Sequence, residues 1–106
     1  MPTYNKLVRD KIPDIIKDTG KKLNTRILSD QEYILELKNK TQEELQEYLN
    51  ANNNEDALEE LADLLELIHA LAKVHGSSIE EVDKLRRTKT EKRGAFDDKV
   101  FLIDVE

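Results

Sequence analysis

The fold of this chain is decided by residues 44–63, ELQEYLNANNNEDALEELAD. The asparagine run at 52–54 is a polar break, because Asn favours turns and helix caps over helix interiors. On each side of the break, apolar residues recur at steps of three and four positions, the pattern of an amphipathic helix. This stretch therefore predicts a hairpin of two helices.

The hairpin's first helix is expected from Gln31 to about Asn50, with Asp30 as its N-cap. Its apolar stripe consists of Ile34, Leu37, Thr41, Leu45 and Tyr48. The second helix is expected from about Asp56 to His75, with Gly76 ending it. The centre of its stripe consists of Leu58, Leu61, Leu65, Ile68 and Ala72.

Shorter elements are expected outside the hairpin. Pro13 suits the first turn of a short helix that runs to about Thr19 and ends at Gly20. The capping-box pattern at 78–81 opens a third helix, which runs to about Arg93. Residues 25–28 are a candidate for a short extended segment, and residues 100–105 are a candidate for a short terminal strand. The predicted fold is all-α, with extended segments only at its edges.

Composition excludes several classes of function. The 106 residues predict one domain, residues 1–106, and include 17 basic and 23 acidic residues, for a net charge of −6. Such a charge argues against a general nucleic-acid-binding surface, because phosphate contacts need clustered Lys and Arg. The absence of cysteine excludes disulfides, thiolate metal sites and thiol nucleophiles. His69 is expected to be a packed helix residue.

No stretch of the sequence predicts secretion or membrane insertion. The first residues have no apolar region of the kind found in signal peptides. The longest aliphatic or aromatic run, residues 100–103, is far shorter than the roughly 20 residues of a membrane span. A soluble, cytoplasmic protein is expected.

Carboxylates on the apolar faces of the two hairpin helices are the most informative feature. At about 100° per residue, Glu60 projects into the apolar arc of its helix between Leu64 and Leu67, and Asp63 lies at the margin of that arc. On the preceding helix Glu44 lies in line with the apolar stripe, and Glu47 lies one step outward. A carboxylate on a core-facing stripe must be neutralised, paired or bound to metal.

An antiparallel hairpin would bring the two acidic pairs close to each other. Four converging carboxylates repel one another unless a hard divalent cation holds them, and oxygen-only ligands favour Mg²⁺ or Mn²⁺. The alternative is that these are ordinary solvated acids in a glutamate-rich helix.

Three motifs carry a resemblance to a known family. Residues 44–47 and 60–63 resemble the E-x-x-E…E-x-x-D metal motif of the all-α nucleoside triphosphate pyrophosphohydrolases, which include MazG-like enzymes, dimeric dUTPases and phosphoribosyl-ATP pyrophosphohydrolase. Residues 4–13, YNKLVRDKIP, resemble the N-terminal signature of the small house-cleaning branch. Residues 92–96, KRGAF, resemble its closing K-R-G-G-F element. Ala62 and Ala95 replace glycines of the family pattern.

The resemblance implies hydrolysis of a nucleoside triphosphate between its α- and β-phosphates, giving a monophosphate and pyrophosphate. It implies Mg²⁺, with Mn²⁺ as the alternative, bound by Glu44, Glu47, Glu60 and Asp63. Glu47 is the expected residue to orient or deprotonate the attacking water. Noncanonical nucleotides are the expected substrates, and ordinary nucleoside triphosphates and phosphoribosyl-ATP are the alternatives. An acidic metal cluster would also need cations to hold a triphosphate. The candidates are Lys6, Arg9, Lys11, Lys38, Lys92 and Arg93. The alternative for each of them is an ordinary solvated side chain.

The expected assembly is a homodimer, because three helices in one chain cannot enclose both the leucine stripe and the carboxylate flank. Two hairpins packed as a four-helix bundle would bury both. A non-enzymatic helical module that dimerises through its leucines, such as an adaptor, is the alternative function.

Overall fold

The structure is a computed structural model, and it describes residues 2–106. It contains four helices and, within those residues, no strand: α1 (Ile12–Asp18), α2 (Asp30–Leu49), α3 (Asn54–Val74) and α4 (Ile79–Arg93). The all-α prediction is confirmed. Residues 25–28 and 100–105 are non-helical, and neither segment pairs with another described segment to form a β-ladder.

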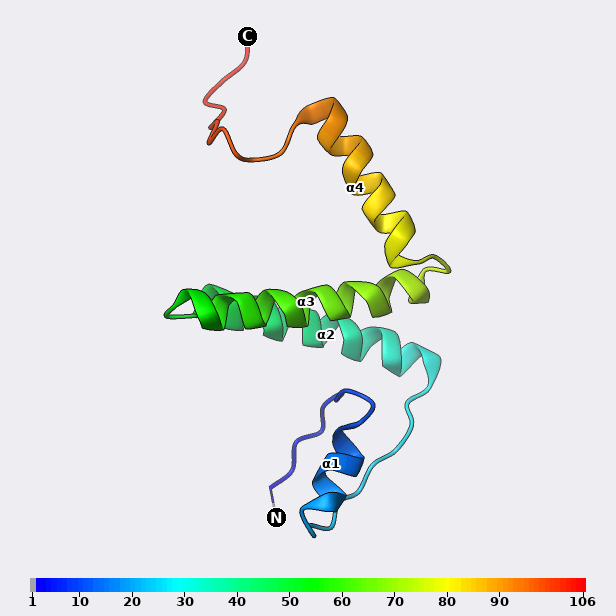
Figure 1. Cartoon of the computed structure of the whole chain (residues 1–106). Helices are drawn as coiled ribbons and strands as arrows, with labels where there is room; N and C mark the ends of the chain where they lie inside the picture. Colours follow the sequence, from blue (N-terminus) through cyan, green and yellow to red (C-terminus); the bar gives the residue numbers. More distant parts are fainter. Residues whose placement is uncertain (1) are drawn as a thin grey trace.

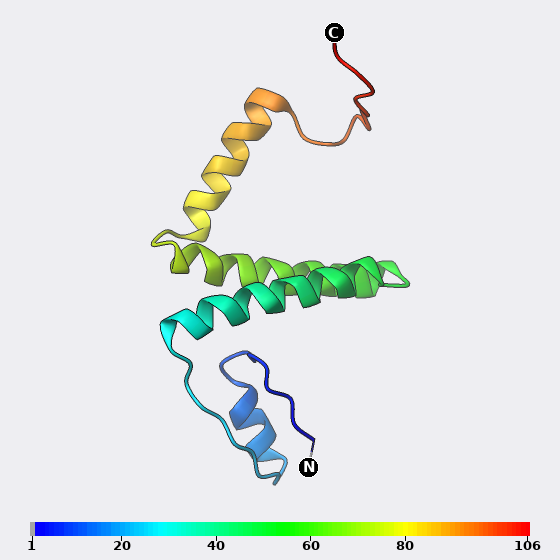
Figure 2. The same cartoon turned by 180° about the vertical axis from the view of Figure 1, so that it is seen from behind.

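The α2–α3 hairpin forms the centre of the molecule (Figure 1). The N-terminal unit, residues 2–28 with α1, lies on one side of the hairpin, and α4 leaves the end of α3 on the other side. The view from behind shows the same arrangement (Figure 2). The two ends of the chain therefore lie on opposite sides of the hairpin.

Capping side chains fix where the hairpin helices begin. The expected N-cap Asp30 is wrong by one residue, because Ser29 forms a capping box with Glu32. The Ser29 hydroxyl accepts a hydrogen bond from the Glu32 backbone N–H, and the Glu32 carboxylate accepts one from the Ser29 N–H. Asn53 caps α3, since its side-chain oxygen accepts a 2.8 Å hydrogen bond from the Asp56 N–H. The polar break thus also starts the second helix.

The end of α3 turns the chain into α4. Gly76 has a φ of 72°, in the left-handed region that disfavours residues with a Cβ. Its N–H bonds to the carbonyl of Lys73, and the Ser77 N–H bonds to that of Ala72, which is the Schellman arrangement. The Ser78 hydroxyl then accepts a hydrogen bond from the Glu81 N–H and caps α4.

A single chain buries very little. Leu37 and Ala72 are its only buried apolar residues within 2–106. The radius of gyration is 18.2 Å, whereas a compact chain of this length has about 13 Å. None of the described helices is long and apolar enough to cross a membrane.

The face of α3 that packs on α2 differs from the expected stripe. Four residues of the flank that carries Glu60 are half-buried: Leu64, Leu67, Leu71 and Val74. Four of the five residues expected at the centre of the stripe are exposed: Leu58, Leu61, Leu65 and Ile68. The apolar arc is wider than one partner helix can cover. Packing on α2 therefore uses one flank of the arc and leaves its centre to solvent.

Candidate metal centre

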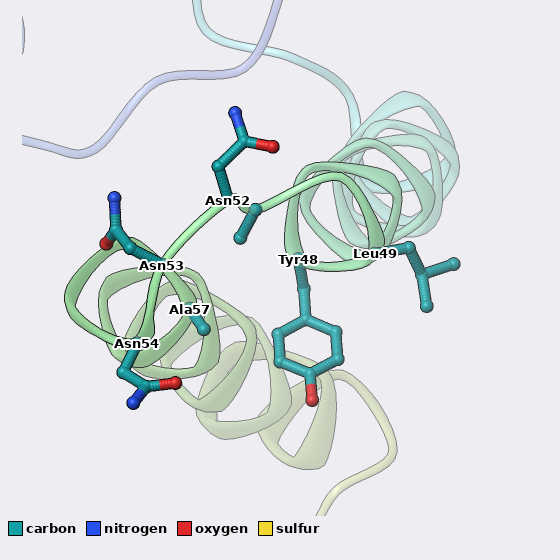
Figure 3. A pocket seen from close by; sticks show the side chains of 7 residues that line it. Tyr48, Leu49, Asn52, Asn53, Asn54 and Ala57 are labelled. Atoms are coloured by element: carbon teal, nitrogen blue, oxygen red, sulfur yellow. The ribbon is translucent and has the colours of Figure 1, made fainter.

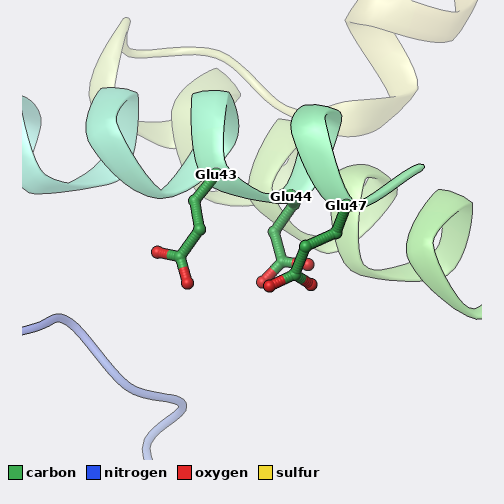
Figure 4. Close-up of side chains that lie close together, drawn as sticks. All are labelled: Glu43, Glu44 and Glu47. Atoms are coloured by element: carbon green, nitrogen blue, oxygen red, sulfur yellow. The ribbon is translucent and has the colours of Figure 1, made fainter. Parts of the chain in front are cut away.

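One turn of α2 carries three glutamates whose carboxylates lie close together. Glu43, Glu44 and Glu47 each place a carboxylate oxygen within 4.8 Å of the other two. All three side chains leave the helix on the same side (Figure 4). Glu44 is the most enclosed, with 7% of its surface exposed, whereas Glu43 and Glu47 are exposed.

The facing turn of α3 supplies two more carboxylates. Glu60 and Asp63 are half-buried and lie three residues apart on one face of the helix. Oxygens of Glu44, Glu60 and Asp63 lie within 4.8 Å of one another. Glu44 belongs to both groups, so the hairpin brings together all four residues predicted as metal ligands. Glu43 was not predicted, because its position on the helix is outside the apolar stripe.

Two cations lie against the acidic residues. The Lys40 ammonium is 3.3 Å from a Glu44 carboxylate oxygen, and Lys40 is mostly enclosed. The Arg9 guanidinium donates a 2.8 Å hydrogen bond to Asp63 and lies 4.0 Å from Glu66. Sequence reasoning selected Arg9 but missed Lys40, although the i, i+4 spacing of Lys40 and Glu44 is the spacing of helix ion pairs.

The crowding of carboxylates separates the pKa values of two of them. The neighbouring Glu44, partial burial and Glu47 together raise the pKa of Glu60 to about 7. Burial alone would raise the pKa of Glu44, but hydrogen bonding with Glu60, Lys40 and Glu47 outweighs it and lowers that pKa. At neutral pH Glu44 is therefore ionised, and Glu60 holds a proton in part of the molecules.

The arrangement fits a hard divalent cation. One carboxylate oxygen each of Glu44 and Glu60, Oε2 in both residues, is buried and has no hydrogen-bond partner. A buried acceptor without a partner is costly, and native structures usually satisfy it with protein, water or an ion. The donors present are carboxylate oxygens from two rigid helices, which suit Mg²⁺ or Mn²⁺ better than softer metals.

The other candidate phosphate-binding residues lie at different distances from this cluster. Lys6 and Lys11 are exposed on the N-terminal unit, and the Lys6 ammonium lies 5.8 Å from the centre of the Tyr4 ring. Lys38 is exposed on α2. Lys92 and Arg93 end α4, on the opposite side of the hairpin from the N-terminal unit (Figure 1). The structure therefore brings only Arg9 of the six into contact with the acidic residues.

Two shallow hollows lie apart from the cluster. One, of about 300 Å³, lies at the hairpin turn and is lined by Tyr48, Leu49, the three asparagines and two alanines (Figure 3). It contains no acidic or basic side chain. The other, of about 470 Å³, lies between α3 and α4 beside the half-buried His69. Neither offers the converging carboxylates that a metal needs.

In comparisons with known proteins, no family model, curated protein or solved structure matches the chain.

The raised pKa of Glu60 predicts how stability depends on pH in the absence of divalent cations. A carboxyl group whose pKa rises on folding, here from 4.5 to about 7, stabilises the fold fully below the lower value. That stabilisation is lost as the pH rises through the higher value. We therefore expect the melting temperature in EDTA to fall between about pH 5 and about pH 8. Glu44 has a lowered pKa, and its contribution is lost only at more acidic pH.

Glu60→Gln should remove this fall and melt at a higher temperature than the wild type at about pH 8, because its amide is neutral at every pH. Glu59→Gln, at the adjacent exposed position, is the matched control and should keep the wild-type profile. Calorimetry of the three proteins at both pH values measures the effect. An unchanged pH dependence in Glu60→Gln would contradict the assignment.

Proposed function

We propose that the protein is a Mg²⁺-dependent nucleoside triphosphate pyrophosphohydrolase of the MazG-like type, which cleaves between the α- and β-phosphates of noncanonical nucleotides. The observation that carries the proposal is the pair of buried, unpartnered oxygens of Glu44 and Glu60 within a cluster of four carboxylates. The E-x-x-E and E-x-x-D spacing and the resemblance of residues 4–13 and 92–96 to family signatures support the same function.

Glu44, Glu47, Glu60 and Asp63 would hold the metal, Mg²⁺ or alternatively Mn²⁺. When bound, a divalent cation offsets the charge of phosphate oxygens and lowers the pKa of water. Glu60 would have to be ionised to act as a ligand. Lys40, which is paired with Glu44, would limit the negative charge of the site.

Glu47 is the residue that we assign to proton transfer from the attacking water. It is exposed, whereas Glu44 is buried and occupied by Lys40. A general base must reach the proton that it removes, and water reaches the outer edge of the cluster first. Glu47 lies on that edge, close enough to Glu60 to raise the pKa of Glu60.

Arg9 is the residue that we assign to the triphosphate. Its guanidinium lies beside Asp63, yet its side chain is 57% exposed. Such an exposed ion pair is weak and can be exchanged. A phosphate offers the guanidinium two parallel hydrogen bonds in place of one. Lys6 and Lys11, on the same N-terminal unit, supply further positive charge.

We propose a homodimer as the working form, with two hairpins packed as a four-helix bundle. The support is the exposed centre of the α3 stripe and the near absence of a core in one chain. Leu58 and Leu65 are each more than half exposed. Burial of their apolar surface in a dimer interface would be favourable by about 25 cal/mol per Å².

Sedimentation at micromolar concentration should give a species of about twice the 12.3 kDa chain mass. Leu65→Lys should shift it towards the single chain, because a charge in the apolar interface is costly to bury. Thr88→Lys, at an exposed position of α4, is the control and should leave the assembly unchanged. A wild-type protein that sediments only as a single chain would contradict the dimer.

The exposed leucines also favour a second candidate, a non-enzymatic module that dimerises or recruits a partner through α3. The two functions differ in what the carboxylates do. An adaptor needs the leucine stripe and tolerates neutral residues at the cluster, whereas a hydrolase loses turnover without its acids.

The function is tested by pyrophosphate release with Mg²⁺ across canonical, oxidised and deaminated nucleoside triphosphates. We expect pyrophosphate with the matching monophosphate, and a loss of about 10²–10⁴-fold in kcat for Glu47→Gln. Glu60→Gln should also lose turnover, because it removes a ligand. Glu59→Gln is the control and should retain activity.

Release of orthophosphate would contradict the assigned bond. If no nucleoside triphosphate of the panel is hydrolysed but phosphoribosyl-ATP is, the cluster acts on phosphoribosyl-ATP instead. Silence on both would favour the non-enzymatic module.

A further inference from the structure

The C-terminal tail, residues 95–106, presents an unusual concentration of apolar surface. Its six large apolar side chains are all at least 74% exposed: Phe96, Val100, Phe101, Leu102, Ile103 and Val105. Single exposed apolar residues are common, but a contiguous group of this size marks an interaction site. The tail therefore exposes an apolar surface that no described residue of its own chain covers.

The charge of the tail restricts what that partner can be. Residues 95–106 contain four acids and one lysine. The segment 29–94 is also acidic, with 16 acids and nine basic residues. The N-terminal unit, residues 2–28, has the opposite sign, with seven basic and three acidic residues. Complementary charge favours and orients contact between the tail and this unit.

The N-terminal unit also exposes apolar side chains beside its basic residues. Ile27 is 96% exposed, and Tyr4 and Ile15 are exposed as well. Lys21 and Lys22 lie on the same non-helical segment as Ile27. The basic end of α4 offers less, because Leu85 is its only large exposed apolar residue. The N-terminal unit therefore matches the tail in both charge and apolarity.

The position of the two surfaces points to a second copy of the chain. The tail and the N-terminal unit lie on opposite sides of the hairpin, and both views show them separated (Figures 1 and 2). A two-fold exchange would let each tail cover the other chain's N-terminal unit. Aromatic side chains bury about 150–250 Å² each, so two tails with six apolar residues each can supply the roughly 1,200–2,000 Å² of a stable interface.

We propose that the C-terminal tail of one chain docks on the N-terminal unit of a second copy, with Phe101 close to Ile27 and the tail's acids facing Lys21 and Lys22. The exchange is reciprocal, so both copies contribute a tail and a receptor. It does not depend on the hydrolase activity, and it adds contacts at the ends of the chain to those of the hairpins.

The natural absence of cysteine makes a cross-linking test clean. One chain carries Ile27→Cys, a second chain with an affinity tag of different mass carries Phe101→Cys, and the two are mixed under mild oxidation. Both positions lie outside the helices and are at least 85% exposed, so neither change should alter the circular dichroism spectrum. We expect the mixed disulfide to exceed both self-pairs at least several-fold.

The matched control replaces Phe101→Cys with Leu85→Cys, an exposed apolar position on α4, and should give little mixed product. Lys21→Glu together with Lys22→Glu should lower the yield of the Ile27–Phe101 product, whereas Lys89→Glu should not. A single chain with both cysteines that closes its disulfide within itself would overturn the proposal, because the tail then reaches its own N-terminal unit. Absence of the mixed product, or an equal yield with Leu85→Cys, would also overturn it.

Discussion

Glu44 on α2 and Glu60 on α3 bring two carboxyl groups within 4.8 Å of each other, and the other charged groups of the site depend on this contact. Each has a buried oxygen without a hydrogen-bond partner. Removing a charge from water is expensive unless it is paired. Two features offset part of this cost: Lys40 pairs with Glu44, and Glu60, with a pKa of about 7, keeps its proton in part of the molecules at neutral pH. Arg9 offsets Asp63. A divalent cation would replace the proton and supply the missing partner for both oxygens.

The same chain is short of buried apolar surface. With only Leu37 and Ala72 buried among residues 2–106, the hairpin has little of the hydrophobic stabilisation that a domain of this length normally has. The stripe of α3 and the C-terminal tail are both apolar surfaces that the single chain leaves exposed. The stripe lies on the hairpin, and the tail lies at the end of the chain. Two copies can therefore bury both surfaces without competition between them.

Local signals in the sequence predicted the helices well. Periodicity and caps gave all four helices to within two residues at each end, because both depend on neighbouring residues alone. The N-cap of α2 was misplaced because Ser29 and Asp30 are both good caps, and only Ser29 has Glu32 three residues later to complete a capping box. The segments 25–28 and 100–105 lack the strand pairing that their apolar residues suggested, since pairing needs a partner strand that one chain does not provide.

The site was predictable to the extent that helix geometry controls it. The i, i+3 spacing and the short turn were enough to predict that Glu44, Glu47, Glu60 and Asp63 converge. Periodicity could not show which flank of the wide arc on α3 packs on α2, because both flanks are apolar. It also could not place Arg9 beside Asp63, 54 positions away, since that contact depends on how the N-terminal unit folds against the hairpin.

The proposed hydrolase needs a divalent cation bound by carboxylates of α2 and α3. The most direct test is to grow crystals with Mn²⁺ at about pH 8 and to collect anomalous diffraction data at the manganese absorption edge. We predict an anomalous peak in contact with carboxylate oxygens of Glu44, Glu60 and Asp63. A well-ordered cluster of these side chains without such a peak would contradict the proposed metal site.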